Sequence, residues 1–492
     1  MDRRLRIISV ASEVAPYSKT GGLADVAKGL PKALASLHHE VSIMTPWYSF
    51  MKSQHLTFAD VSLRTVIVVG KIKYDVEVKR LPIRKNFNVY FLIIPKLFCK
   101  RSNIYGYDDD NLRFLVFNLS VLKVADLLGI KPHIIHCHDW QTGLIPNFLA
   151  LKRKNYPTLK STKTLFTIHN LAFQAGVDWW RIDKRHRDNG KGIPKTSARD
   201  LHAVNFTKRA IRYADMINTV SIRYAQEILT PEYGQGLERA LQEREHDLYG
   251  IINGIDYAVN NPAFDTYIKY KYDQRSLDRK VRNKLLLQKE AGFEQKKDIP
   301  LIGVVNRLTE QKGFALIMET IEVLMRQQLQ IVVVGSGQRE YIQFFRNIAR
   351  KHPKKIGIIT PFTEEMASKV YAGSDIFLMP SRYEPCGISQ LISMRYGSIP
   401  IVHETGGLSD TITNYNPRTG KGSGFVFRSY TSGDFLIALA RAFETFGHEK
   451  AWEHLMRQAM RESYAWALPA KKYVTLYRIL QKKKIRSKKY FS

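Results

Sequence analysis

Cysteine is scarce in this 492-residue chain, which contains only Cys99, Cys137 and Cys386. The count is odd and no CxxC spacing occurs, so neither a disulfide framework nor a structural zinc site is expected. Long apolar runs are absent too. No stretch reaches the roughly 18 residues that a membrane span needs, and the apolar stretch 5–11 ends before Glu13, too early for a secretory signal. We therefore expect a protein of a reducing compartment, the cytoplasm.

Acidic residues are few relative to basic ones, with 45 Asp and Glu against 76 Lys and Arg and a formal net charge of +31. Such a charge favours contact with anions. One diphosphate needs only a few cations, so a lysine-rich solvated surface is the simpler interpretation, and an anionic partner is the alternative. No RRM, KH or zinc-finger signature accompanies the basic end 482–492, so no specific nucleic-acid partner is expected.

Strand-like and helix-like segments alternate along the chain. The first series predicts helices at 23–37 and 111–128, a hairpin over 64–81, and strands at 6–10, 41–45, 134–137, 164–168, 217–220 and 250–252. The second series predicts strands at 301–305, 331–334, 356–359, 376–379 and 399–402, with helices between them. This alternation indicates the α/β class, with two doubly wound, Rossmann-like domains.

The segment 257–274 separates the two series and is rich in Asn, Asp, Tyr and Lys. We therefore predict an N-terminal domain at 1–256, a linker at 257–274 and a second domain at 275–466. A final helix and basic tail would cover 467–492. Ligands of open α/β sheets bind beyond the carboxyl ends of the strands, and a cleft between two such domains is the expected site.

Two groups of polar residues lie just after strands of the first series. Lys19 adds a cation before Gly21 and Gly22, which let backbone amides approach a phosphate at a helix start. An ordinary strand-to-helix turn is the alternative. The segments 136–141 and 167–170 offer His and Asp for sugar hydroxyls or a metal, although an Asp-x-Asp pair is missing and buried, hydrogen-bonded histidines are common. The run 108–110 is interpreted as the start of a helix.

Three more groups lie just after strands of the second series. Arg307 and Lys312 can both reach one point and neutralise a diphosphate without a metal. The segment 380–390 places Glu384 ahead of the amides of a helix start at 387–389. The segment 405–408 is another glycine-rich helix start.

Together these segments resemble bacterial glycogen synthases and plant starch synthases. The resemblance rests on motifs that occur in order over nearly the whole chain: SEVAPYSKTGGLADV, HCHDWQ, TIHN, INGID, NRLTEQKG, PSRYEPCG, TGGLSDT and WALPAKKYVTLY. It implies a glycosyltransferase-B fold, in which two facing domains close on the donor and the last helix crosses back to the first domain. It also implies metal-independent transfer of glucose, with retention, from ADP-glucose or UDP-glucose to an α-glucan such as glycogen.

The resemblance also assigns roles to individual residues. The catalytic residues would be Glu384, His169, Asp139, Arg307 and Lys312. The donor would be bound by Lys19, Gly21, Gly22, Asn170, Asn253, Gly335, Cys386, Gly387, Ile388, Ser389 and Gln390. No residue is assigned to a metal. These roles fit the chemistry, because carboxylates stabilise positive charge at the sugar carbon and cations stabilise the leaving diphosphate.

Two alternatives to a glucan synthase are open. A related retaining transferase would have a second glutamate eight positions after Glu384, where this chain has Ile392. A glucan-binding protein without turnover is the other alternative, since Gln141, Arg209, His403 and Asn306 depart from the family pattern. The sequence does not distinguish an adenine from a uracil donor.

Overall fold

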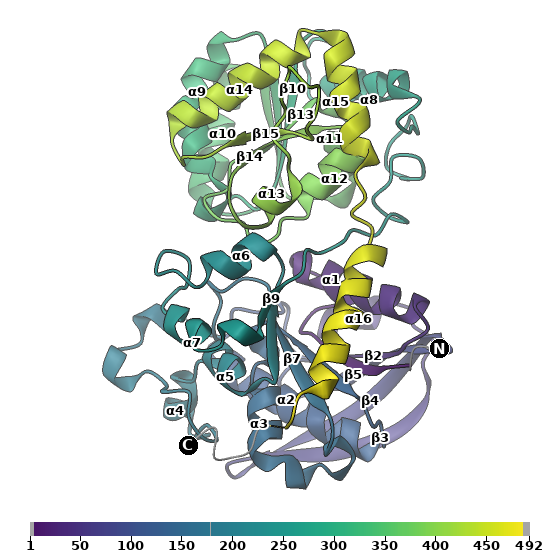
Figure 1. The fold of residues 1–492 in the computed structure, drawn as a ribbon, viewed down its shortest axis with the longest axis vertical. Helices are drawn as coiled ribbons and strands as arrows, with labels where there is room; N and C mark the ends of the chain where they lie inside the picture. The colour runs from purple at the N-terminus through teal and green to yellow at the C-terminus, as the bar shows by residue number, and fades with distance from the viewer. Residues whose placement is uncertain (1–3, 178, 486–492) are drawn as a thin grey trace. The chain divides into compact units, whose positions relative to one another are not determined.

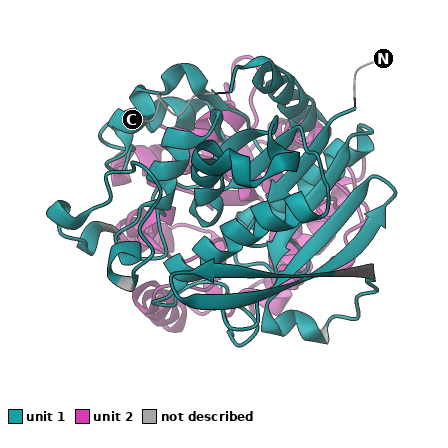
Figure 2. Cartoon of the chain, turned by 90° about the horizontal axis from the view of Figure 1, so that it is seen from below, with its two compact units in different colours: residues 1–254, 466–492 teal, residues 255–465 magenta. Residues whose placement is uncertain are grey.

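The computed structural model describes residues 4–177 and 179–485, and the chain divides into two compact units. Unit 1 comprises residues 1–254 with 466–492, and unit 2 comprises residues 255–465 (Figures 1 and 2). Each unit has its own sheet and core. Among the described residues, no helix is both long and apolar enough to cross a membrane.

Unit 1 is built on a nine-stranded sheet in the order β3-β4-β5-β2-β1-β6-β7-β8-β9. Its strands are β1 (Arg6–Val10), β2 (Glu40–Pro46), β3 (Ala59–Val69), β4 (Ile72–Arg84), β5 (Phe87–Ile93), β6 (Ile134–His138), β7 (Lys163–Ile168), β8 (Met216–Thr219) and β9 (Leu248–Gly250). Neighbours from β5 to β9 are parallel, whereas β4 is antiparallel to both β3 and β5. The predicted hairpin therefore extends one edge of a parallel sheet.

The helices of unit 1 pack on this sheet and on one another. They are α1 (Gly22–Ser36), α2 (Asp110–Leu127), α3 (Leu144–Lys152), α4 (Ala198–His202), α5 (Phe206–Tyr213), α6 (Ile222–Glu227), α7 (Glu238–Gln242) and α16 (Ala467–Lys482). Short 3-10 turns include η2 (Trp140–Thr142). Helix starts and ends agree with the predictions for α1 and α2 to within a residue or two.

Helix α16 packs into unit 1 although it comes after unit 2 in the chain. Its buried residues recur every three or four positions, including Tyr473, Tyr477 and Leu480, as expected for one apolar face. A Cβ on Gly29 of α1 would lie 2.0 Å from Nε1 of Trp466, just before α16, so only glycine admits this indole. The helix thus completes the core of unit 1.

Unit 2 is built on a six-stranded, wholly parallel sheet in the order β12-β11-β10-β13-β14-β15. Its strands are β10 (Leu301–Val305), β11 (Gln330–Val334), β12 (Ile356–Ile359), β13 (Ile376–Met379), β14 (Ile399–His403) and β15 (Phe425–Phe427). Its helices are α8 (Leu277–Glu290), α9 (Phe314–Arg326), α10 (Arg339–Lys351), α11 (Glu364–Gly373), α12 (Ser389–Arg395), α13 (Gly406–Thr411), α14 (Ser432–Phe446) and α15 (Glu449–Arg461).

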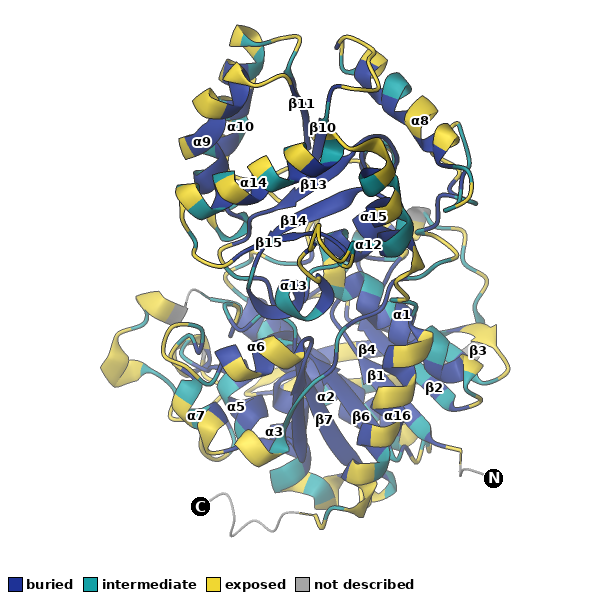
Figure 3. Ribbon diagram, turned by 45° about the horizontal axis from the view of Figure 1, so that its top comes forward, coloured by how far each residue is buried: buried dark blue, intermediate teal, exposed yellow. Residues whose placement is uncertain are grey.

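Burial in both units follows the layers of a doubly wound fold. Figure 3 shows buried strands in dark blue and helices whose outer sides carry exposed residues. This arrangement confirms the predicted α/β class with two doubly wound sheets.

The segment 257–274 differs from the predicted linker, because it belongs to unit 2. Ile268 and Tyr272 are buried in the core of that unit. The Asp265 carboxylate accepts hydrogen bonds from the backbone N–H of Tyr267 at 2.8 Å and from the Tyr396 hydroxyl at 2.7 Å. Asn and Asp here form turns that fold the segment onto the domain. The chain passes between units at 254–255 and 465–466.

The structure shows contacts for the two charged runs named from the sequence, 108–110 and the basic run that begins at 482. Asp109 does not cap α2 with its side chain but pairs with Arg101 at 2.6 Å, and Asp110 forms a buried ion pair with Arg113. In the basic run before the C-terminus, Lys483 pairs with Asp247. The tail 486–492 lies outside the described residues.

Candidate active site

The carboxyl edge of the unit 1 sheet carries Asp139 and His169, which come directly after the parallel neighbours β6 and β7. Asp139 has φ 57° and ψ 179°, a conformation that only glycine adopts readily and that costs other residues about 1–3 kcal/mol. Two hydrogen bonds hold it there. Its N–H donates to Thr167 O at 2.9 Å, and its Oδ1 accepts from His169 N–H at 2.7 Å. Strain of this kind is common where a side chain must point at a ligand.

Burial sets the protonation of this pair. It raises the pKa of Asp139 to about 7, and the His169 and Asn170 amides oppose the shift. Burial lowers the pKa of His169 to about 3, so its imidazole is neutral near pH 7. The His169 Nε2 lies 3.0 Å from His138 Nδ1, so one of these nitrogens carries the shared proton. The pair can therefore accept from or donate to sugar hydroxyls.

His136 and His138 fit the structural alternative that the sequence left open. Both are fully buried. His136 contacts the Tyr477 hydroxyl at 2.8 Å and the Thr167 hydroxyl at 2.5 Å, and His138 contacts Ser9 at 3.2 Å. Within the described ranges, no group of three or more His, Cys, Asp or Glu could hold a metal ion. These two histidines therefore support the strand ends that carry Asp139 and His169.

The loop predicted to hold phosphate is occupied in part by a carboxylate. Glu13 Oε2 accepts from the Thr20 N–H at 2.5 Å and the Thr20 hydroxyl at 3.0 Å. Lys19 pairs with Asp25 at 3.0 Å, at the start of α1. A Cβ on Gly21 would meet no atom within 4 Å, so the space above this glycine is open to a ligand.

Glu13 and Tyr105 were not singled out from the sequence. Glu13 is 3% exposed, and burial raises the pKa of its carboxyl. The Tyr105 hydroxyl lies 2.7 Å from Ser12 Oγ and 3.4 Å from Glu13 Oε1. An acidic residue soon after a buried strand was the available signal for Glu13. No local spacing could indicate Tyr105, because 92 residues separate it from Glu13.

In unit 2 the structure brings Lys312 and Glu384 together. Lys312 Nζ lies 2.5 Å from Glu384 Oε2, and the Ser381 hydroxyl donates to the same oxygen at 3.1 Å. Both charged side chains are largely buried, with 11% and 7% exposure. Gly313 permits this approach, because it has φ 76° and a Cβ there would lie 1.7 Å from Pro380 O. The strand-end loops after β10 and β13 therefore form one charged centre.

Arg307 lies after the same strand as Lys312 but has a different environment. Its side chain is exposed, and it has no ion-pair partner among the residues that the structure describes. A fixed buried cation and an exposed guanidinium thus lie on one short loop of seven residues, 307–313. This combination suits a diphosphate, because the contacts of a guanidinium with oxygen atoms are directional and an ammonium is a point charge.

The segment 386–390 divides into buried and accessible parts. Gln390 is buried, and its Nε2 donates to Cys386 O at 3.0 Å and Gly387 O at 3.2 Å. Cys386 is buried as well, so this pair stabilises the loop. Gly387, Ile388 and Ser389 are partly exposed at the start of α12, as the phosphate prediction requires.

Three glycines of unit 2 lie against the backbone of neighbouring segments. Cβ atoms on Gly406 and Gly407 would lie 2.0 Å from Glu384 O and 2.1 Å from Cys386 O. A Cβ on Gly335 would lie 2.1 Å from Asn306 O. These glycines therefore allow close packing of backbones. Asn253 is 3% exposed, and its Oδ1 has no hydrogen-bond partner among the described residues.

Known proteins are similar to this chain over nearly its whole length. The model of a starch synthase catalytic domain matches residues 6–243, and that of glycosyl transferases group 1 matches residues 288–458. The chain is 41% identical over 495 residues to the glycogen synthase of Desulforudis audaxviator, with 97% of each chain covered. It is also 41% identical over 480 residues to that of Moorella thermoacetica, again with 97% of each covered. The chain belongs to the glycogen synthase family.

Solved structures agree with this assignment. This member of the glycogen synthase family superposes with a TM-score of 0.87 on the catalytic domain of starch synthase IV from Arabidopsis thaliana, with 32% identity and coverage of 98% and 100%. Sucrose-phosphate synthase from Thermosynechococcus elongatus, at 15% identity and a TM-score of 0.63, shares the fold. The chain is thus a glycosyltransferase with a glycosyltransferase-B fold, of the family that makes glycogen and starch.

Two of the residues that depart from the expected family pattern, His403 and Gln141, are buried. His403 Nδ1 lies 2.9 Å from Ser381 O, beside the loop that carries Glu384, and burial lowers the pKa of its imidazole. The backbone oxygen of Gln141 accepts from Asn118 Nδ2 at 2.6 Å, and Gln141 is 5% exposed.

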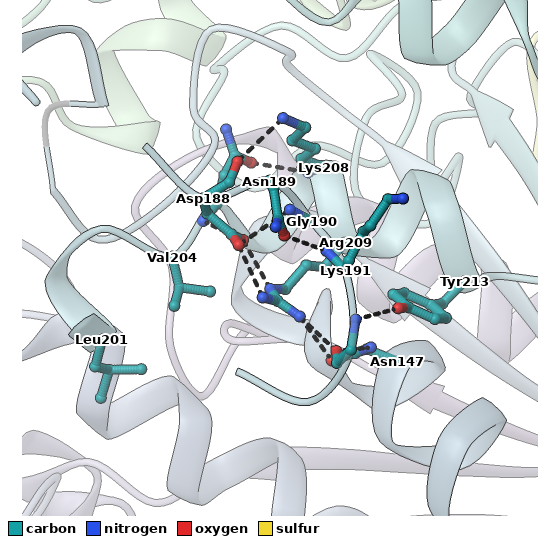
Figure 4. Close-up of polar contacts among 12 residues, drawn as sticks. Asn147, Asp188, Asn189, Gly190, Lys191, Leu201, Val204, Lys208, Arg209 and Tyr213 are labelled. Atoms are coloured by element: carbon teal, nitrogen blue, oxygen red, sulfur yellow. Dashed lines mark hydrogen bonds and ion pairs between the residues drawn. The ribbon is translucent and has the colours of Figure 1, made fainter. Parts of the chain in front are cut away.

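Arg209 is the third departure and holds the loop 188–192. Figure 4 shows its guanidinium directed at Asp188 and Asn147. Nε and Nη2 donate to the two carboxylate oxygens of Asp188 at 2.7 and 2.8 Å, and Nη1 donates to Gly192 O at 2.7 Å. Gly192 N–H in turn donates to the Tyr213 hydroxyl at 2.7 Å. Arg209 is therefore a structural residue in this glycogen synthase relative.

Proposed function

We propose that the chain transfers glucose from ADP-glucose to the non-reducing end of an α-1,4-glucan such as glycogen, with retention of configuration. One observation carries the choice of donor. The catalytic domain of starch synthase IV, which is 32% identical over 98% of this chain, was solved bound to ADP and acarbose. The similarity of the two structures favours adenine over uracil in the donor.

The proposed chemistry separates charge at the glycosidic bond. Positive charge develops at the sugar carbon, and Asp139 and Glu384 are the carboxylates proposed to stabilise it. Negative charge develops on the leaving diphosphate. We propose that Arg307 and Lys312 stabilise the negative charge on the leaving oxygen of the diphosphate. Lys19 and the backbone amides of residues 387–389 would bind its phosphate groups. His169, neutral near pH 7, would hydrogen-bond the transferred glucose.

A metal ion is not required by this proposal. Two cations on one loop can neutralise a diphosphate as a divalent ion would, and the Lys312 ammonium already has a fixed position beside Glu384. Excluding water from the donor would favour transfer over hydrolysis.

The test is glucose transfer from radiolabelled ADP-glucose and UDP-glucose, in parallel, to a glycogen primer, with EDTA and with added Mg²⁺. We expect transfer from ADP-glucose at a higher kcat/KM than from UDP-glucose, and equal rates with EDTA. A preference for UDP-glucose would overturn the donor assignment. No transfer from either donor, with glycogen binding intact, would favour a binding protein without turnover.

A further inference from the structure

A basic pocket lies in unit 1, apart from the residues described so far. Its volume is about 920 Å³. Four parts of the chain line it: the residues before β1, the end of α1 with the turn after it, the turn between β4 and β5, and one side of α16. The cations among its lining residues are Arg4, Arg84, Lys85, Lys471 and Arg478.

Positive charge dominates this pocket. None of the described residues that line it is acidic. Arg84 donates to the neutral Ser36 hydroxyl, at 3.2 Å, and neither Lys85 nor Lys471 has a carboxylate partner in the described part of the chain. Arg4 pairs with Glu40 at 3.4 Å on an exposed surface, where such a pair contributes little. The end of α1 adds only about −0.5 charge, which five cations outweigh.

The pocket lies at the opposite edge of the sheet from the candidate active site. Arg4, His39 and Asn86 precede the first residues of β1, β2 and β5, which are parallel neighbours. Asp139 and His169, by contrast, come after the last residues of β6 and β7 in the same sheet. Helix α1, whose 15 residues give about 22 Å at 1.5 Å each, separates the pocket from the loop at 19–21.

The walls of the pocket are held together. Asn86 Nδ2 donates to Ala35 O and His39 O, each at 2.8 Å, and so fixes the β4–β5 turn to the end of α1. His39 Nδ1 accepts from Leu5 N–H at 3.2 Å, which fixes the residues before β1 to the same point. The segments that carry Arg4, Arg84 and Lys85 therefore have fixed positions around the pocket, which lowers the entropy lost on binding.

We propose that this pocket binds a small molecule with two or more phosphate groups. Arginine forks and lysine ammonium groups are the side chains that recognise phosphate oxygens. The Ser36 and Thr475 hydroxyls add neutral hydrogen-bonding groups to the lining. The volume fits a small molecule, since ligand pockets measure roughly 300–1,000 Å³. This site gives part of the excess positive charge a function separate from the donor diphosphate.

The experiment is isothermal titration calorimetry on the full chain with fructose 1,6-bisphosphate, in about 150 mM NaCl, near physiological ionic strength, and saturating ADP. ADP fills the proposed donor site, so binding that persists reports a second site. We expect a Kd below about 1 mM. The double variant Lys85→Glu/Lys471→Glu should raise this Kd at least about tenfold, because the two substitutions reverse two charges that face the ligand.

A matched variant, Lys154→Glu/Lys160→Glu, changes the net charge equally at exposed positions of unit 1 outside the pocket. It should bind the bisphosphate like the parent, and thermal unfolding should show both variants folded. Displacement by ADP, equal weakening in both double variants, or no binding at this salt concentration would each overturn the proposal. None of these outcomes depends on glucan transfer.

Discussion

Lys312 and Glu384 form an ion pair that is largely withdrawn from solvent, at a distance of 2.5 Å. If the ammonium stabilises the leaving diphosphate, Lys312→Ala should lower kcat with ADP-glucose by about 10²–10³-fold, the effect of removing one transition-state donor. Steady-state kinetics on a glycogen primer measures it.

The matched control is Lys369→Ala, which removes a more exposed lysine of unit 2 from Glu290 and Glu365. Its kcat should equal that of the parent. A Lys312→Ala variant with the parental kcat would remove Lys312 from the mechanism.

Asp139 leads to a prediction about stability and pH. Its pKa is 3.8 in the reference state and about 7 in the folded protein, so ionisation is easier in the unfolded chain. The folded state is therefore penalised increasingly as pH rises from about 4 to 7, and fully above 7. Asp139→Asn should raise the free energy of unfolding, relative to the parent, by more at about pH 8 than at about pH 5.

Urea unfolding of variant and parent at both pH values measures this difference. Asp298→Asn, at an exposed position, should show no such trend. A stability difference for Asp139→Asn that stays constant between the two pH values would contradict the raised pKa.

At the scale of single residues, the sequence predicted the polar groups at strand ends better than their contacts in space. Strand ends and motif types indicated Asp139, His169, Lys312 and Glu384, whose catalytic roles stay predictions. The contact of Glu13 with the Thr20 amide depends on how the loop folds, which no local pattern reveals.

The pair Gly406–Gly407 is a clear sequence pattern that has two structural interpretations. Two glycines at the start of a helix suit either a bound phosphate or a closely packed backbone. Their close contacts with the backbone of Glu384 and Cys386 give a packing reason for both glycines, which the sequence alone could not show.

At the scale of elements, the loop 188–192 depends on Arg209. The Arg209 and Asp188 side chains are 4% and 8% exposed, so removing the guanidinium leaves a buried carboxylate without its cation. It also removes one of two donors to the Gly192 carbonyl, the other being Asn147 Nδ2 at 3.1 Å. Arg209→Ala should lower the free energy of unfolding by about 3–5 kcal/mol, as for other broken buried ion pairs. Urea unfolding measures it.

Arg185→Ala provides the comparison. Arg185 pairs with Asp183 just before the loop 188–192, but its side chain is 84% exposed. Its unfolding curve should overlay that of the parent, since exposed pairs contribute little. Similar losses of stability for both variants would mean that burial does not distinguish the two pairs.

Most elements were predictable because each is a short apolar run between polar turns. β1, β10, β12 and β13 have the predicted bounds. β5, with the sequence FNVYFLI, was not predicted, although it pairs with both β2 and β4. A strand buried within a sheet lacks clear apolar–polar alternation, which is the main periodic signal of a strand. β15 has only three residues, too few for any period.

At the scale of the whole molecule, the chain leaves unit 1 after Gly254 and returns at Trp466. The family resemblance implied that the last helix crosses back to the first domain, and the structure confirms this, but the individual contacts of the helix were not predicted. The Tyr477 hydroxyl reaches His136 across 341 residues of chain, and the Tyr473 hydroxyl accepts from Asn218 at 3.0 Å across 255. Such long-range contacts leave no local pattern.

This connectivity predicts that the two units differ in their ability to fold when they are produced as separate fragments. Residues 255–465 form a continuous chain with their own core, so they should fold alone and unfold cooperatively. Residues 1–254 alone should not, because the buried side chains of α16 are missing from their core. Circular dichroism and thermal unfolding of the two fragments test this.

Rejoining α16 should restore unit 1. A Cβ on Gly254 would lie 2.7 Å from the Trp466 Cα, so these two residues are adjacent and a few Gly and Ser residues can join 254 to 466. The joined chain should unfold cooperatively, whereas the same chain with Tyr473→Ala and Tyr477→Ala should be much less stable, because two large buried side chains are lost. Cooperative unfolding of residues 1–254 without α16 would show that the helix covers a core already complete.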